Sequence, residues 1–276
     1  MLNWSTNFGK WALLMGTINF ENVSKTFSGQ TEIRALEDVS FAVGEGEFVA
    51  LLGPSGCGKS TMLNLLAGFE KTTEGTLLFD GKGVTRPGPD RGVVFQEAAL
   101  FPWLTVWQNV IFGPQVQGIA RSEYEPQARK LLKLVGLEAF AQVLPAQLSG
   151  GMRQRVGIAR ALVMSPKALL MDEPFGALDA QTRLSMQQLL LDVWQTLGTT
   201  VLFVTHDIDE AILLSDRICV MSARPGRIIR TIPITLARPR SIASLTSGEF
   251  VAYKAAIMSD MKVTSVVDLT FAPSKP

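Results

Sequence analysis

The sequence predicts an α/β fold built on a mostly parallel sheet, and two observations lead to this prediction. Apolar runs of β character alternate with helical patterns along the 276-residue chain. Several runs are almost entirely apolar, at 48–52, 168–171 and 200–204, as is typical of strands covered on both faces. Ligands of such sheets bind beyond the carboxyl ends of the strands. The residues that follow each run are therefore the candidate site.

The first third of the chain is predicted to be rich in strands. Short apolar segments are separated by Asn22, by glycines and by the Asp80–Gly81 pair, all of which are typical of turns. The expected strand segments are 18–20, 39–43, 48–52, 77–79 and 93–95.

The middle of the chain, from about residue 98 to 166, has a helical pattern, for example at 128–137. The apolar strands at 168–171 and 200–204 then enclose a long helical pattern at 183–197. Another strand is expected at 218–221, and a polar tail ends with a helical stretch near 249–261.

A glycine-rich loop follows the apolar run 48–52 and has the spacing G-x-x-x-x-G-K-[ST]. In such a loop, glycines let successive N–H groups turn around an anion, and the following helix adds positive potential. Lys59 can reach the outer phosphates, and the Ser60 hydroxyl can hold Mg²⁺. We therefore expect a nucleoside triphosphate here. The loop consists of Gly53, Pro54, Ser55, Gly56, Cys57, Gly58, Lys59, Ser60 and Thr61.

Polar residues follow three other apolar runs. After 169–171, Asp172 can anchor Mg²⁺ and Glu173 can polarise an attacking water, although a solvated Asp–Glu pair is the plain alternative. His206, the only histidine, ends the run 200–204 and can reach a terminal phosphate, whereas a lone histidine is more often structural. Gln96, after 93–95, can be both a ligand and a sensor near Mg²⁺, or simply an exposed amide.

A second anion site is predicted at Ser149, Gly150 and Gly151, which open a helical run that extends through Leu162. Ser149 can cap this helix, and an ordinary capped helix is the plain alternative. A Ser-Gly-Gly helix start also suits an anion. Because one nucleotide has a single set of phosphates, two anion sites suggest a γ-phosphate held from both sides.

Composition excludes some partners. With 26 basic and 25 acidic residues scattered along the chain, no field of one sign favours nucleic acid, and we expect no nucleic-acid partner. Two cysteines are too few for a disulfide framework, which fits a reducing compartment. The 47% share of hydrophobic residues predicts that a partner covers some apolar surface.

In order and spacing these motifs resemble the ATPase subunit of ABC transporters over about residues 17–230, with LSGG at 148–151 the most discriminating. The resemblance implies a P-loop NTPase core with a mostly parallel sheet, an N-terminal antiparallel β subdomain and an inserted α-helical subdomain. The implied boundaries are 1–16 for an N-terminal extension, 17–236 for the ABC ATPase domain, about 98–165 for its helical subdomain and 237–276 for a C-terminal tail.

The resemblance also implies ATP and Mg²⁺ as cofactors and a head-to-tail homodimer. Each ATP would lie between loop 53–61 of one copy and Ser149, Gly150 and Gly151 of the other. Phe27 would stack on adenine, and Asp179 would act across the interface. Met152 stands where the family usually has Gln, which leaves a role of this side chain in turnover open.

The same resemblance implies a role for each polar strand end. Glu173 would be the catalytic base, and His206 would contact the γ-phosphate. Ser60, Gln96 and Asp172 would lie at Mg²⁺, with Gln96 also counted among the catalytic residues.

Three segments, 87–96, 100–106 and 222–228, resemble the group that serves taurine, alkanesulfonate and nitrate importers. This implies uptake of a small sulfonate or oxyanion through two transmembrane permease subunits, with a solute-binding protein as an indirect partner. The subunit would be peripheral, at the cytoplasmic face of the inner membrane. Segment 101–107, with two Trp and a Phe, would receive the permease, or else be core of the helical subdomain. The alternative function is a soluble non-transport ABC ATPase.

Overall fold

The computed structural model describes residues 16–29 and 31–270, so most of the expected N-terminal extension lies outside the described residues. These residues form two compact units, each described by itself below. The β-rich unit comprises residues 17–87 and 202–270. The helical unit comprises Gly16 and residues 88–201.

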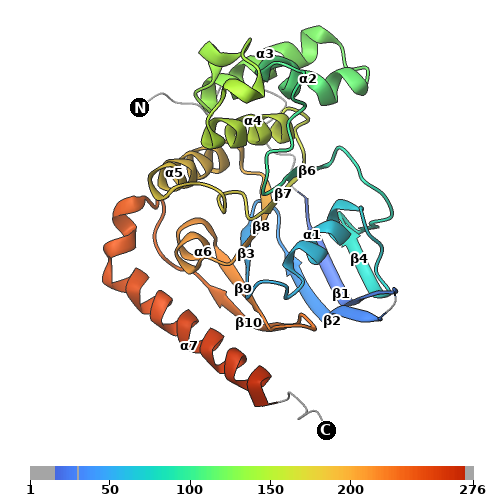
Figure 1. Ribbon diagram of the computed structural model, residues 1–276, viewed down its shortest axis with the longest axis vertical. Helices are drawn as coiled ribbons and strands as arrows, with labels where there is room; N and C mark the ends of the chain where they lie inside the picture. Colours follow the sequence, from blue (N-terminus) through green and yellow to red (C-terminus); the bar gives the residue numbers. More distant parts are fainter. Residues whose placement is uncertain (1–15, 30, 271–276) are drawn as a thin grey trace. The chain divides into compact units, whose positions relative to one another are not determined.

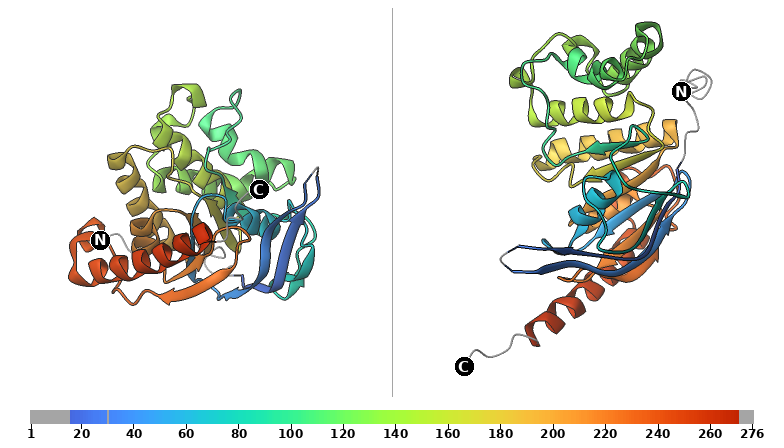
Figure 2. Two further views of the ribbon diagram at one scale, coloured as in Figure 1. Left: turned by 60° about the horizontal axis from the view of Figure 1, so that its bottom comes forward. Right: turned by 90° about the vertical axis from the view of Figure 1, so that its right-hand side faces the viewer.

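An antiparallel sheet opens the β-rich unit, with the strand order β2-β1-β4-β5. The strands β1 and β2 form a long antiparallel hairpin (Figure 2). The bounds are β1 Ile18–Phe27, β2 Ile33–Val43, β4 Glu74–Phe79 and β5 Lys82–Gly83.

The same unit contains the strand order β10-β9-β3-β8, in which β3 and β9 are parallel and β10 is antiparallel to β9. Every residue of β3 and β8 is buried, as expected for strands covered on both faces. The bounds are β3 Phe48–Leu52, α1 Lys59–Ala67, β8 Thr200–Thr205, α6 Ile208–Leu214, β9 Arg217–Met221 and β10 Ile228–Pro233. The first two residues of β8 belong to the helical unit.

The helical unit has two parallel strands, β6 and β7, whose register pairs Val94 with Met171. In Figure 1, α2, α3 and α4 lie together beyond these strands. Their facing apolar side chains, such as Val110, Leu131 and Val156, are fully buried. The bounds are β6 Arg91–Val94, α2 Val106–Val116, α3 Arg121–Leu134, η3 Glu138–Phe140, η4 Pro145–Gln147, α4 Gly150–Leu162, β7 Ala168–Asp172 and α5 Ala180–Leu197.

The C-terminal segment closes over α6, with η5 at Ile242–Thr246 and α7 at Gly248–Thr270. Its anchor is Arg240, which is only 2% exposed. The guanidinium donates hydrogen bonds to backbone carbonyls of Ile212 (3.0 Å) and Ser215 (2.5 Å) at the end of α6, and of Ile234 (2.9 Å) and Leu236 (3.2 Å) in its own segment. Desolvation lowers the pKa of Arg240 to about 10, so this side chain remains charged at neutral pH.

The predicted fold class is confirmed, because parallel strand pairs and a separate antiparallel sheet are both present. The reading of Asn22 as a turn between strands is wrong. Asn22 has a φ of 51° and lies inside β1, where the register with β2 shifts. Its backbone N donates to Ser40 Oγ (2.9 Å) and its side chain to Asp38 Oδ1 (2.8 Å), so the strand continues through a bulge.

Arg240 generates a prediction about stability. Replacing it with Ala removes the donors of several buried carbonyls, and we expect the free energy of unfolding to fall by about 3 to 5 kcal/mol. Urea denaturation measures the change. Arg121→Ala is the matched control, since this residue forms only an exposed ion pair with Glu125 on α3. Equal midpoints for the two variants would contradict the anchoring role.

Candidate functional site

The glycine-rich loop connects the buried strand β3 to the start of α1. Gly56 and Gly58 have φ angles of 77° and 98°, which favour glycine. A Cβ on Gly58 would also lie 2.6 Å from Leu36 Cδ2, so space as well as backbone angle requires glycine there. Gly58 is the N-cap of α1 and provides no side-chain cap. The first-turn N–H groups of this helix have no side-chain cap and could therefore bind an anion.

Lys59, at the start of α1, is buried, with 4% of its surface exposed. Its ammonium donates to the carbonyls of Gly53 and Pro54, both at 2.9 Å, and lies 3.9 Å from the buried Cys57 Sγ. The Lys59 ammonium is thus held inside the loop by carbonyls of the loop itself. The remaining loop residues are exposed or half-buried: Pro54, Ser55, Gly56, Ser60 and Thr61.

His206 follows β8 in the same unit and is exposed. Both of its neighbours are fixed by hydrogen bonds. Thr205 Oγ1 donates to Glu210 Oε2 (2.7 Å) and accepts from Asp207 N (3.0 Å). Asp207 in turn caps α6 by accepting from the N–H groups of Asp209 (2.8 Å) and Glu210 (3.1 Å). The backbone that carries His206 is therefore held between a strand end and a capped helix.

Phe27 is the last residue of β1 and pairs with Ile33 of β2. This residue is 38% exposed. The β-rich unit thus holds three of the predicted elements: the loop with Lys59, His206 and Phe27.

Gln96, Asp172 and Glu173 lie in the helical unit, at the carboxyl ends of β6 and β7. Because these strands are parallel and adjacent, the three residues emerge at the same edge. A Cβ placed on Gly176 would lie 3.3 Å from Gln96 Nε2 and 3.9 Å from Glu173 Oε2, so these two side chains approach a common point. Glu173 has a φ of 41°, a costly conformation for a residue with a side chain.

The segment that carries Gln96 is fixed by α4. Gln154 Nε2 donates to Phe95 O at 3.0 Å, and the Arg160 guanidinium donates to the carbonyls of Ala98 and Ala99, each at 2.8 Å. Desolvation lowers the pKa of Arg160. Gln154 and Arg160 were not predicted from the sequence. Their partners Phe95 and Ala98 lie 59 and 62 positions away along the chain, and such distant contacts leave no local sequence pattern.

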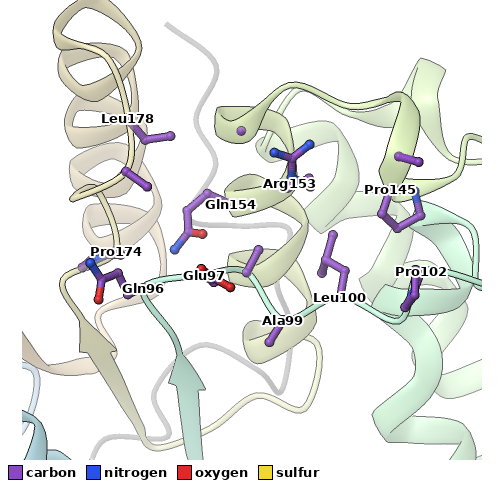
Figure 3. A pocket seen from close by; sticks show the side chains of 14 residues that line it. Gln96, Glu97, Ala99, Leu100, Pro102, Pro145, Arg153, Gln154, Pro174 and Leu178 are labelled. Atoms are coloured by element: carbon purple, nitrogen blue, oxygen red, sulfur yellow. The ribbon is translucent and has the colours of Figure 1, made fainter.

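A cavity of about 590 Å³ opens beside this segment (Figure 3). Its lining residues include Gln96, Leu100 and Pro102 and, from α4, Arg153 and Gln154. The helix start at Gly150 also contributes to its wall. The cavity therefore connects Gln96 with the predicted second anion site.

Ser149 is the N-cap of α4, as expected, and its Oγ accepts a hydrogen bond from Met152 N at 3.3 Å. Ser149 and Gly150 are exposed, whereas Gly151 is buried against Thr182. A Cβ on Gly151 would lie 2.5 Å from Thr182 Cγ2, which explains the need for glycine.

Asp179 is the N-cap of α5 and accepts from Thr182 N at 3.0 Å. The hydrogen bonds with Thr182 lower the pKa of this exposed carboxyl. Asp179 is therefore ionised at neutral pH, next to the helix start that holds Gly151.

Among the described residues no cluster of three or more His, Cys, Asp or Glu side chains could hold a metal. No helix of the described part of the chain has the length and hydrophobicity to span a membrane.

Comparisons with known proteins agree with this arrangement. Residues 36–176 match a family model described as ABC transporter. An uncharacterized ABC transporter ATP-binding protein of Methanocaldococcus jannaschii is 50% identical over 246 residues, which are 89% of this chain and 91% of that protein. A taurine import ATP-binding protein of Pseudomonas aeruginosa is 48% identical over 225 residues, 81% of this chain and 86% of that protein.

Among solved structures, an ATP-binding cassette in a dimeric post-hydrolysis state bound to ADP and Pi superposes with a TM-score of 0.68. It is 38% identical and covers 79% of this chain and 98% of its own. The chain therefore belongs to the ABC transporter family as an ATP-binding subunit, an enzyme that couples ATP hydrolysis to transport.

Proposed function

We propose that this subunit energises the import of a small sulfonate or oxyanion of the taurine, alkanesulfonate or nitrate type. The observation that carries the proposal is the 48% identity to a taurine import ATP-binding protein over 86% of that protein's length. Two transmembrane permease subunits are the proposed direct partners, and a solute-binding protein is an indirect one. The subunit would lie peripherally at the cytoplasmic face of the membrane.

In the proposed cycle, loop 53–61 holds the phosphates of ATP. Its N–H groups and the start of α1 supply a positive, preorganised cradle, which the buried Lys59 ammonium completes. Phe27 stacks on adenine. The exposed His206 donates to the γ-phosphate from its fixed backbone position.

Mg²⁺ would be held by Ser60, Gln96 and Asp172, and it would neutralise charge that develops on the phosphates. These hydroxyl, amide and carboxylate oxygens match the preference of Mg²⁺ for few protein oxygens alongside phosphate. Asp172, at the end of buried β7, is only half exposed, which restricts its motion.

Glu173 is the proposed general base, which orients and deprotonates the attacking water. The Glu173 and Gln96 side chains both approach Gly176, so in the proposed mechanism the two could contact the same water. The left-handed φ of Glu173 is consistent with a residue held in a demanding geometry for function.

We propose further that two copies enclose ATP head to tail. The exposed Ser149 and Gly150 would bind the γ-phosphate in the partner's loop, and Asp179 would act across the same interface. Ser149 already accepts a hydrogen bond through Oγ, so its hydroxyl hydrogen is available to donate to a phosphate oxygen.

An aromatic patch on the helical unit is the proposed permease contact. We define it by Phe101, Trp103, Phe112 and Val116. Trp103 is 71% exposed and Val116 67%. The Phe101 ring makes tilted contacts with the rings of Trp103 and Phe112, at centroid distances of 5.7 Å and 4.5 Å. The patch also adjoins the Gln96 segment, because Arg160 contacts the Phe101 ring and binds the carbonyls of Ala98 and Ala99.

Replacing Glu173 with Gln should leave ATP binding intact and slow hydrolysis at least about 100-fold, because the amide cannot accept the proton of water. It should also trap the ATP-bound dimer. Phosphate release and light scattering on a sizing column measure the two effects. Glu138→Gln, at an exposed position of η3, is the control. Unchanged hydrolysis in the Glu173 variant would remove it as the base.

Replacing Trp103 with Glu should spare ATP affinity but abolish most coupling, because a charge would be buried where the permease contacts the aromatic patch. Transport into proteoliposomes and the ATP dissociation constant are compared. Phe140→Glu places the same charge on another exposed aromatic of this unit and should transport normally. Equal transport by wild type and the Trp103 variant would refute the docking assignment.

The solute is tested with the assembled complex, including permeases and binding protein. Taurine should raise its ATPase rate, whereas β-alanine, the carboxylate of matching length, should not. Alkanesulfonates and nitrate are measured in parallel and assign the solute within the proposed class. A complex that responds to none of these anions would contradict import of a sulfonate or oxyanion.

A further inference from the structure

The free end of the β1–β2 hairpin carries Phe27. The pairing of β1 with β4 ends at Ser24 and Glu74, whereas the pairing with β2 continues to Phe27 and Ile33. Beyond Ser24 the hairpin is thus a two-stranded ribbon, which Figure 2 shows projecting from its own sheet. A two-stranded ribbon is marginally stable by itself. The position of Phe27 therefore depends on the contacts that hold this end of the hairpin in place.

Lys25 makes the contacts that hold the end of the hairpin. Although it is a lysine, only 9% of its surface is exposed. Its ammonium donates to Glu70 Oε2 at 2.8 Å and to Lys71 O at 2.9 Å, and it lies 4.7 Å from the centroid of the Phe27 ring. One buried cation thus contacts a carboxylate, a backbone carbonyl and an aromatic face.

The partners of Lys25 follow the carboxyl end of α1. Glu70 N donates to Asn64 O at 3.3 Å, which wraps this segment onto the last turn of the helix. A second link supports the first, since Thr26 N donates to Thr73 Oγ1 at 3.0 Å. Because α1 starts at the phosphate loop and has nine residues, about 13 Å of rigid helix separates the loop from the segment that holds Lys25.

We propose that Lys25 is a positioning residue for the Phe27 ring in nucleotide binding. It covers one face of the ring with its ammonium and ties the hairpin end to α1, so that the other face is presented to the base at a fixed distance from the phosphate loop. This inference rests on the proposed function, in which Phe27 stacks on adenine.

The chemistry of Phe27 explains why such a residue is needed. A Tyr at this position could be oriented through its hydroxyl, but Phe has no polar group with which to fix its ring. A cation over one face provides an attraction that depends on ring orientation. The burial of the Lys25 ammonium is compensated by its hydrogen bonds to the Glu70 carboxylate and the Lys71 carbonyl.

The test is a double-mutant cycle on ADP affinity, measured by calorimetry in Lys25→Met, Phe27→Ala and the double variant. Pyrophosphate is the probe without a base. Lys25→Met should bind ADP about three- to tenfold more weakly, and pyrophosphate as tightly as wild type. In the Phe27→Ala background, the Lys25 substitution should have no further effect.

Two further variants complete the design. Lys82→Met removes a charge from an exposed position of the same antiparallel sheet and should bind ADP normally. If Lys25→Met does not fold, Glu70→Gln loosens the ammonium instead and should weaken ADP binding selectively over pyrophosphate.

The outcomes separate the two hypotheses. An equal loss for ADP and pyrophosphate, or a Lys25 effect that persists without the Phe27 ring, would overturn the positioning role while leaving Phe27 as the base platform. Unchanged ADP affinity in Phe27→Ala would instead overturn the platform in the proposed function, and the Lys25 inference with it.

Discussion

Close packing of loop 53–58 is the constraint on which much of the β-rich unit depends, because the proposed anion site needs the N–H groups of this loop held in place. The loop is enclosed from several directions by side chains and backbone of the same unit. A Cβ on Gly53 would lie 3.1 Å from Met221 Cβ, and a Cβ on Gly226 would lie only 2.0 Å from Cys57 O. Such packing holds the cradle in one conformation, so that little ordering remains to be done when a phosphate binds.

A second constraint lies at Glu173 in the helical unit. A left-handed φ costs a residue with a side chain of the order of 1 to 3 kcal/mol, so the surroundings must impose it. Buried neighbours on both sides, Met171 and Phe175, leave this segment little freedom to relax. Gln154 and Arg160 hold the facing Gln96 segment in the same way, through its carbonyls. The backbone segments that carry Glu173 and Gln96 are thus both held in place by their surroundings.

The sequence predicted those features whose cause is local. The glycine loop, the polar ends of apolar strands and the Ser149 cap all depend on residues within a few positions of one another. It did not predict the full length of β1 and β2, because their polar residues and bulges at Asn22 and Asp38 mimic turns. It also missed β10, and the buried Arg240, whose carbonyl partners lie up to 28 residues away. Such contacts between distant residues become visible only in the tertiary structure.

The proposed nucleotide-binding residues differ in solvent exposure. In the proposal, Lys59 binds the chain's own nucleotide, and Ser149 and Gly150 bind that of a partner copy. Lys59 is almost completely buried and bound to its own loop, so only a ligand that enters this loop can reach it. Ser149 and Gly150 are exposed at the start of α4. Ser149 Oγ already caps α4, so the fold of this chain does not need an anion at that helix start. In the proposed head-to-tail dimer, a second copy would bring the phosphate to it.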